Sequence, residues 1–98
     1  MRQQYESADL NELAKIMEAE EVIVNNVFEA AYCKCKGFEI GKITYNKAQN
    51  IASIQIVGKE EDIKRCINDY YMNGQVDAKK YADEVGFIKY TITKKAKA

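Results

Sequence analysis

Hydrophobic residues in the first third of the chain recur with two periods, one typical of helices and one of strands. A helix is predicted over residues 9–19, because its hydrophobic residues have i, i+3, i+4 and i+7 spacing: Leu10, Leu13, Ala14 and Met17. The short β-branched segment 21–25 predicts a strand. Asn26 can then cap a second helix, with Glu29 at its third position and the hydrophobic stripe Phe28, Ala31, Tyr32 and Cys35.

The middle of the chain has the pattern of two antiparallel strands. Gly37 can end the second helix in a left-handed conformation. Hydrophobic residues alternate from Phe38 onwards, and the alternation changes phase across Gly41 and Lys42, which predicts a β-bulge. Residues 46–50 are polar and predict a hairpin loop. On the returning strand one side is formed by Ala52, Ile54 and Ile56, and we expect the core on this isoleucine side.

Two further helices are predicted after the hairpin. Acidic residues open the first of them near residue 60, and its hydrophobic stripe is Ile63, Cys66, Ile67 and Tyr70. Asn73 and Gly74 predict a tight corner, and Asp77 can cap a last helix with the stripe Tyr81, Val85, Ile88 and Ile92. Gly86 and the β-prone run 87–93 leave a terminal strand as the alternative for its second half.

These patterns predict an α+β fold with a small, mainly antiparallel three-stranded sheet covered by helices, in the order α-β-α-β-β-α-α. A chain of 98 residues is long enough for one domain, 1–98. We expect an acidic N-terminal helix in residues 1–20, the core in residues 21–93 and a frayed basic tail in residues 94–98. The sequence shows neither a long apolar run nor a secretory signal pattern, which favours a cytoplasmic protein with no membrane partner.

The formal net charge of zero is unevenly divided along the chain. Residues 1–29 contain seven acidic and two basic side chains, whereas residues 30–98 contain eight acidic and thirteen basic ones. An acidic face repels nucleic acid and a basic face attracts it, so the charge pattern leaves both protein and nucleic-acid partners open.

The residue types of common active sites are scarce. Histidine, the commonest general base and zinc ligand, is absent, and the two serines lie outside nucleophile and phosphate-binding motifs. Cys33 and Cys35 would point to opposite sides of a helix, and Cys66 alone does not complete a metal site. We therefore predict reduced thiols, no metal, no cofactor and no enzymatic activity.

Several short motifs follow one another in a fixed order between residues 22 and 93. They are Ala-Ala-Tyr at 30–32, Lys-Gly-Phe at 36–38, Tyr-Tyr-x-Asn-Gly at 70–74 and Val-Asp-Ala at 76–78, followed by Tyr81 and Ala82. In this order the chain resembles a family of short uncharacterised proteins found in bacterial, archaeal and phage genomes. The resemblance suggests an accessory gene and implies no activity. The acidic segment before residue 20, Cys33 and Cys35 depart from the family pattern.

We expect the protein to act by protein–protein interaction, as a phage or mobile-element accessory protein that inhibits a host defence machine. The partner-binding residues would then be Glu12, Glu18 and Glu20. The same helix could instead join two copies into a homodimer through Leu10, Leu13 and Met17. The alternative function is nucleic-acid binding by the basic hairpin through Lys34, Lys36, Lys42, Tyr45 and Lys47, with Tyr32 and Tyr45 stacking on bases.

Overall fold

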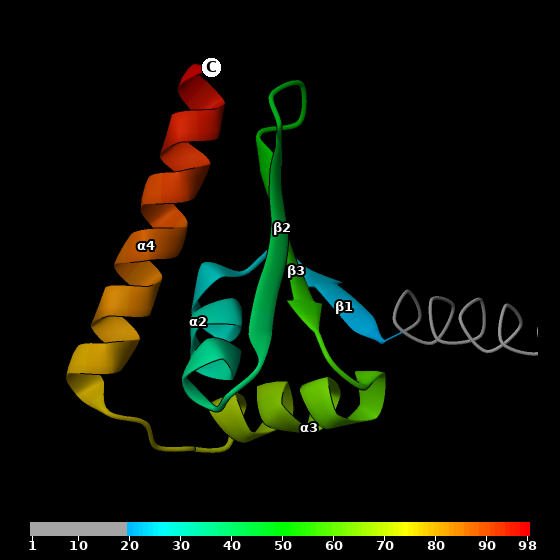
Figure 1. The fold of residues 1–98 in the computed structure, drawn as a ribbon, viewed down its shortest axis with the longest axis vertical. Helices are drawn as coiled ribbons and strands as arrows, with labels where there is room; N and C mark the ends of the chain where they lie inside the picture. The colour runs from blue at the N-terminus through cyan, green and yellow to red at the C-terminus, as the bar shows by residue number, and fades with distance from the viewer. Residues whose placement is uncertain (1–19) are drawn as a thin grey trace, which may run out of the picture.

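The computed structural model describes residues 20–98, so the helix expected over residues 9–19, with Glu12 and Glu18, lies outside the described residues. The elements are β1 (Glu21–Val24), α2 (Val27–Cys35), β2 (Glu39–Asn46), β3 (Ile51–Val57), α3 (Glu60–Tyr71) and α4 (Ala78–Lys97). The strands form one antiparallel sheet with the order β1-β3-β2 (Figure 1). The predicted α+β class and three-stranded antiparallel sheet are confirmed.

The core lies between the sheet and α2, as predicted for the isoleucine side of β3. Ile54 and Ile56 are fully buried, as are Ala30, Ala31 and Cys33 of α2. Helix α2 is central because it contacts α4, α3 and all three strands, whereas α3 lies across the end of the sheet where β1 begins (Figure 1).

Phe28 does not belong to the buried stripe of α2 that the sequence predicted. Its side chain is 40% exposed, and the ammonium of Lys89 lies 5.1 Å from the centre of its ring. The buried residues of α2 are Ala30, Ala31, Tyr32 and Cys33, because α2 is covered from several sides rather than along one stripe.

The predicted phase change in β2 is a β-bulge. Ile40 pairs with Ile56 and Ile43 pairs with Ile54, so three steps along β2 match two steps along β3. The bulge at Gly41 is closed by Gln55, whose side-chain oxygen accepts a hydrogen bond from the backbone N–H of Lys42 at 2.8 Å. Because of the extra residue, Ile40 and Ile43 both face the core although their spacing is odd.

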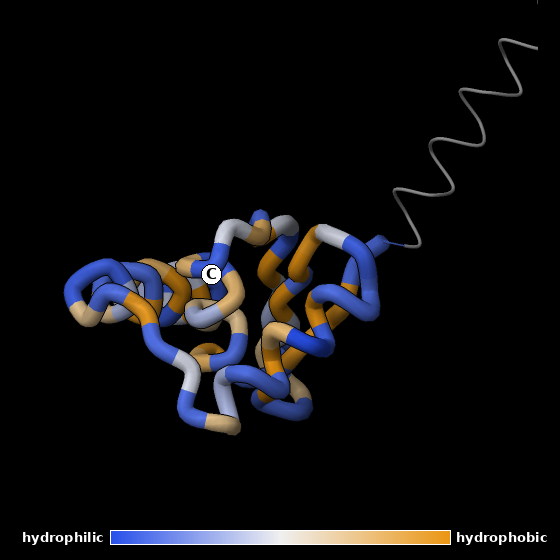
Figure 2. The backbone as a smooth tube through the Cα atoms, turned by 90° about the horizontal axis from the view of Figure 1, so that it is seen from below, coloured by the Kyte–Doolittle hydropathy of each residue, from blue (hydrophilic) through white to orange (hydrophobic). Residues whose placement is uncertain are grey.

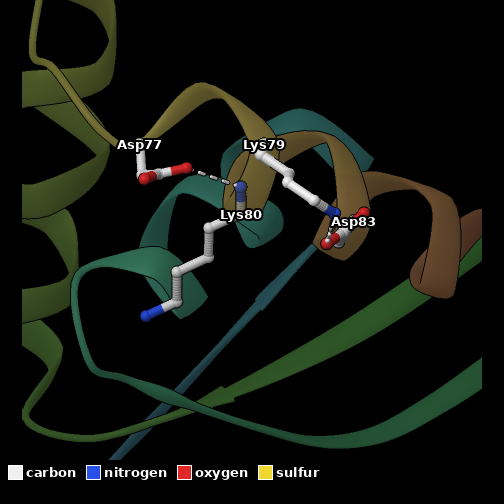
Figure 3. Close-up of polar contacts among 4 residues, drawn as sticks. All are labelled: Asp77, Lys79, Lys80 and Asp83. Carbon is white, nitrogen blue, oxygen red and sulfur yellow. Dashed lines mark hydrogen bonds and ion pairs between the residues drawn. The ribbon is translucent and has the colours of Figure 1, made fainter.

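The corner between α3 and α4 forms where Asn73 and Gly74 predicted it. Asn73 takes the left-handed conformation, with φ 71°, and the backbone N–H of Gly74 donates to the carbonyl of Asp69 at 2.9 Å. Asp77 then caps α4, because its carboxylate accepts a hydrogen bond from the backbone N–H of Lys80 at 2.9 Å (Figure 3).

Helix α4 is longer than the sequence predicted. It continues as one helix through Lys97, so the alternative of a strand over 87–93 is wrong, and the expected frayed tail from Lys94 is the last turn of this helix. The reason is tertiary, because Val85, Ile88 and Ile92 pack on the core and outweigh the β-propensity of this segment. Along the helices, hydrophobic and hydrophilic residues are interleaved (Figure 2).

Within residues 20–98, no helix combines the length and the hydrophobicity needed to cross a membrane.

Candidate binding groove

A hollow of about 430 Å³ lies between α4 and β2. We call it the α4 groove, and it is lined by Lys34, Ile40, Gly41, Lys42, Ile43, Glu84, Phe87, Ile88, Thr91 and Lys95. Helix α4 runs beside β2, and its C-terminal end reaches the level of the β2–β3 turn (Figure 1). At that end the ammonium of Lys47 donates a hydrogen bond to the carbonyl of Ala98, which joins the turn to the helix.

The two walls of the groove follow from local structure. On the strand side, the bulge places Lys42 between two isoleucines that face the core. On the helix side, the lining residues recur with helical spacing, since Glu84, Phe87, Ile88, Thr91 and Lys95 lie within three turns of one face. The result is an apolar floor with charged groups around it.

The charged groups of the groove are three lysines and one glutamate. Lys42 and Lys95 are exposed, Lys34 is half-buried, and Glu84 is half-buried. Among residues 20–98 the ion pairs are Lys64 with Glu60, Arg65 with Asp62 and Lys79 with Asp83 (Figure 3), so none of the groove lysines has a carboxylate partner there. Their charge is therefore available to a ligand.

Exposed aromatic residues extend the groove along α4. Phe87 and Tyr90 are each 61% exposed, and a second hollow of about 390 Å³ is lined by Phe87, Tyr90, Thr91, Lys94, Lys95 and Ala98. Phe87, Thr91 and Lys95 line both hollows. The ammonium of Lys94 lies 5.6 Å from the centre of the Tyr90 ring. The distal half of α4 thus presents hydrophobic and basic surface together.

The residues predicted to bind nucleic acid do not converge on one surface. Lys34 and Lys42 line the α4 groove, and Lys47 lies in the β2–β3 turn. Lys36, the C-cap of α2, instead donates to the carbonyl of Gln75 at 2.8 Å, in the segment between α3 and α4. Tyr45 is half-buried, and its hydroxyl is hydrogen-bonded to the side chain of Asn50.

Tyr32 is not available for base stacking, so this expectation is wrong. Its side chain is only 2% exposed, and its hydroxyl donates a hydrogen bond to the carboxylate of Asp69. Burial and this hydrogen bond raise the pKa of Tyr32 to about 12. The ring is part of the contact between α2 and α3, where it packs against Tyr70 with ring centres 5.5 Å apart.

Of the acidic residues predicted to bind a partner, Glu20 is described by the structure. It is half-buried at the start of β1, and its carbonyl accepts a hydrogen bond from the backbone N–H of Gly58 at 2.9 Å. Lys59 and Lys64 line a shallow hollow with it. Glu20 thus lies at the β1 edge of the sheet, while the α4 groove lies along β2 at the opposite edge.

The three thiols are poorly suited to nucleophilic chemistry. Burial raises the pKa of Cys33, Cys35 and Cys66, so the thiolate is disfavoured at neutral pH. All three are free in the structure. In the described part of the chain, no group of three histidine, cysteine or carboxylate side chains is close enough to hold a metal ion.

The groove residues of α4 were missed by the sequence analysis, although a signal for them existed. Glu84, Phe87, Thr91 and Lys95 have helical spacing of their own and lie next to the predicted stripe in the sequence, so the same period places them together on one face of the helix. The β-prone composition of 87–93 obscured this period.

Comparisons of the chain with protein-family models, with curated proteins and with solved structures gave no match. The family resemblance of residues 22–93 therefore stays a prediction.

Proposed function

We propose that this chain is a non-catalytic binding protein that acts by protein–protein interaction, and that its α4 groove receives an acidic, partly hydrophobic segment of the partner. The observation that carries the proposal is the combination of an apolar floor with three lysines that have no carboxylate partner among the described residues. A carboxylate that meets such a lysine gains attraction, while a hydrophobic side chain on the floor supplies most of the affinity.

The shape of the surface favours a peptide segment over a nucleic-acid strand. A single strand needs a continuous basic track, whereas Lys36 and Lys47 each donate a hydrogen bond to a backbone carbonyl, that of Gln75 and that of Ala98. Nucleic-acid binding remains the second proposal, because the exposed ring of Tyr90 beside Lys94 and Lys95 could stack on a base.

The expected phage or mobile-element setting, with a host defence machine as partner, belongs to this proposal. It rests on the family resemblance and on the absence of histidine and the scarcity of serine in the sequence.

The test uses the full chain and two defined probes. An amphipathic model peptide with a leucine stripe flanked by glutamates should shift the amide NMR signals of residues lining the α4 groove, and a peptide of the same composition in scrambled order should not. Binding should weaken but persist between about 50 and 300 mM salt, because the Debye length shortens while the apolar contact remains. A short single-stranded oligonucleotide serves as the competing probe.

Charge reversal locates the binding. The double variant Lys42→Glu/Lys95→Glu should lose at least tenfold in affinity for the peptide. The control Lys64→Glu/Lys79→Glu makes the same change in net charge at exposed lysines outside the groove. Equal losses of peptide affinity in both variants would show that net charge alone attracts the peptide, and would contradict binding at the α4 groove. Tighter binding of the oligonucleotide than of the peptide at both salt concentrations would favour the second proposal instead.

A further inference from the structure

We infer that the α4 groove binds residues 9–19 of a second copy of this chain, so that two chains exchange these segments in a homodimer. The inference rests on the proposed function, because it names the partner of the same groove. It is carried by the charge and hydrophobic pattern of the segment and by the position of the groove in the fold.

Residues 9–19 have the chemistry that the groove requires. They contain three acidic residues and one basic residue, and a stripe of Leu10, Leu13, Ala14 and Met17. At about 100° per residue in a helix, Asp9 lies on one flank of this stripe and Glu18 on the other, while Glu12 lies on the opposite side. The segment thus offers hydrophobic side chains bordered by carboxylates.

The groove presents the complementary arrangement. Its floor contains Ile40, Ile43 and Phe87, with a lysine on each wall: Lys42 on the strand side and Lys95 on the helix side. Carboxylates on both flanks of a helix seated on this floor would each face an ammonium group. Glu84 is the one acidic group in the lining, against three lysines.

The position of the groove favours exchange between copies over insertion within one chain. A single residue, Glu20, separates the predicted helix from β1, and β1 and β2 are the two outer strands of the sheet. Within one chain, α2 packs between β1 and α4 and contacts both of them, so it stands in the direct path from β1 to the groove. The segment of a second copy has no such obstacle.

The exchange closes on itself. Each chain supplies one segment and one groove, so a two-fold arrangement makes two equal contacts and leaves neither groove open. Because the second contact forms within an already joined pair, modest affinity at each groove gives a stable dimer.

Sedimentation equilibrium of the full chain tests the inference through charge complementation. The wild-type chain should be a dimer at tens of micromolar, and the model peptide in excess should dissociate it. The groove variant Lys42→Glu/Lys95→Glu and the segment variant Asp9→Lys/Glu18→Lys should each be monomeric, because each confronts like charges at both contacts. Mixed in equal amounts they should form a heterodimer, since the basic segment meets the acidic groove and the unaltered segment meets the unaltered groove.

Glu12→Lys is the matched control, because it changes the charge of the segment on the side away from the stripe, and this variant should stay dimeric. Circular dichroism of each variant verifies that the domain is folded. A monomeric wild-type chain, or a mixture of the two variants that stays monomeric, would overturn the inference. If the wild-type chain is monomeric while the model peptide still maps to the groove, the exchange is wrong and the proposed function stands. If the peptide leaves the groove signals unchanged and does not dissociate a dimer, the proposed function fails as well.

Discussion

The hydroxyl of Tyr32 in α2 donates a hydrogen bond to the carboxylate of Asp69 in α3, and the backbone of Gly74 lies directly against this pair. A Cβ atom added to Gly74 would lie 2.5 Å from the Asp69 carboxylate oxygen and closer still to the Tyr32 hydroxyl. The corner between α3 and α4 therefore needs glycine at 74 for space, while the left-handed conformation is taken by Asn73.

Gly74→Ala should lower the free energy of unfolding by about 2 kcal/mol, because the methyl group forces Tyr32 and Asp69 apart. Gly86→Ala is the control, since nothing lies within 4 Å of a Cβ there, and it should raise the free energy of unfolding by about 0.5–1 kcal/mol as a glycine leaves a helix interior. Urea unfolding measures both. Unchanged stability in Gly74→Ala would contradict the packing described for this corner.

Stability should decline in alkaline solution, partly through Tyr32. Its pKa is raised to about 12 by burial and by the Asp69 hydrogen bond, against about 10 in an unfolded chain. The folded state therefore favours the protonated phenol, and this contribution is complete below about pH 10 and is lost as the pH rises from about 10 towards 12. Urea unfolding at several pH values should show a weaker decline for Tyr32→Phe.

Tyr90→Phe, at an exposed tyrosine, serves as the control and should leave that decline unchanged. Tyr81 should account for part of what remains in Tyr32→Phe, because burial and a hydrogen bond with Tyr70 raise the pKa of Tyr81 to about 12. Identical pH profiles for the wild type and Tyr32→Phe would rule out the role given to Tyr32.

The helix caps make opposite predictions for α4 and α3. Asp77→Ala should lower the free energy of unfolding by about 1 kcal/mol, because the N–H of Lys80 loses its acceptor. Asp77→Asn should retain most of the stabilisation by this cap. Lys59 begins α3 without a side-chain cap, so Lys59→Ser should raise stability by about 0.5–1 kcal/mol. Thermal and urea unfolding measure the change in stability of each variant. A destabilised Lys59→Ser would contradict the statement that α3 begins without a side-chain cap.

Two neighbouring residues of α4 should separate stability from binding. Ile88 is fully buried, and Ile88→Ala should cost about 2–5 kcal/mol of unfolding free energy. Phe87 is 61% exposed, and Phe87→Ala should stay within about 0.5 kcal/mol of the wild type while weakening binding of the model peptide. Full peptide affinity in Phe87→Ala would show that this ring does not contribute to binding at the α4 groove.

Much of the fold could be predicted from the sequence where local chemistry decides it. The caps at Asn26 and Asp77, the bulge across Gly41 and Lys42, and the corner at Asn73 all lie where the residue types placed them. Each depends on hydrogen bonds or backbone preferences within a few residues, which a sequence pattern can reveal.

The candidate site was predicted only in part, because it joins residues from separate elements. Lys34 and Lys42 were selected from the sequence, but their convergence with Lys95 depends on how α4 packs beside β2. Lys36 was selected with them and lies elsewhere, since spacing along the chain does not determine direction in space.

The sequence by itself thus determined the class of fold, the order of the elements from β1 to α4, the caps of α2 and α4 and the corner after α3, because these follow from short-range periodicity and capping. The tertiary structure decided the full length of α4, the burial of Tyr32, the need for glycine at 74 and the existence of a basic, apolar groove. All four depend on packing between segments distant in sequence, and such contacts override local preference when they bury hydrophobic surface.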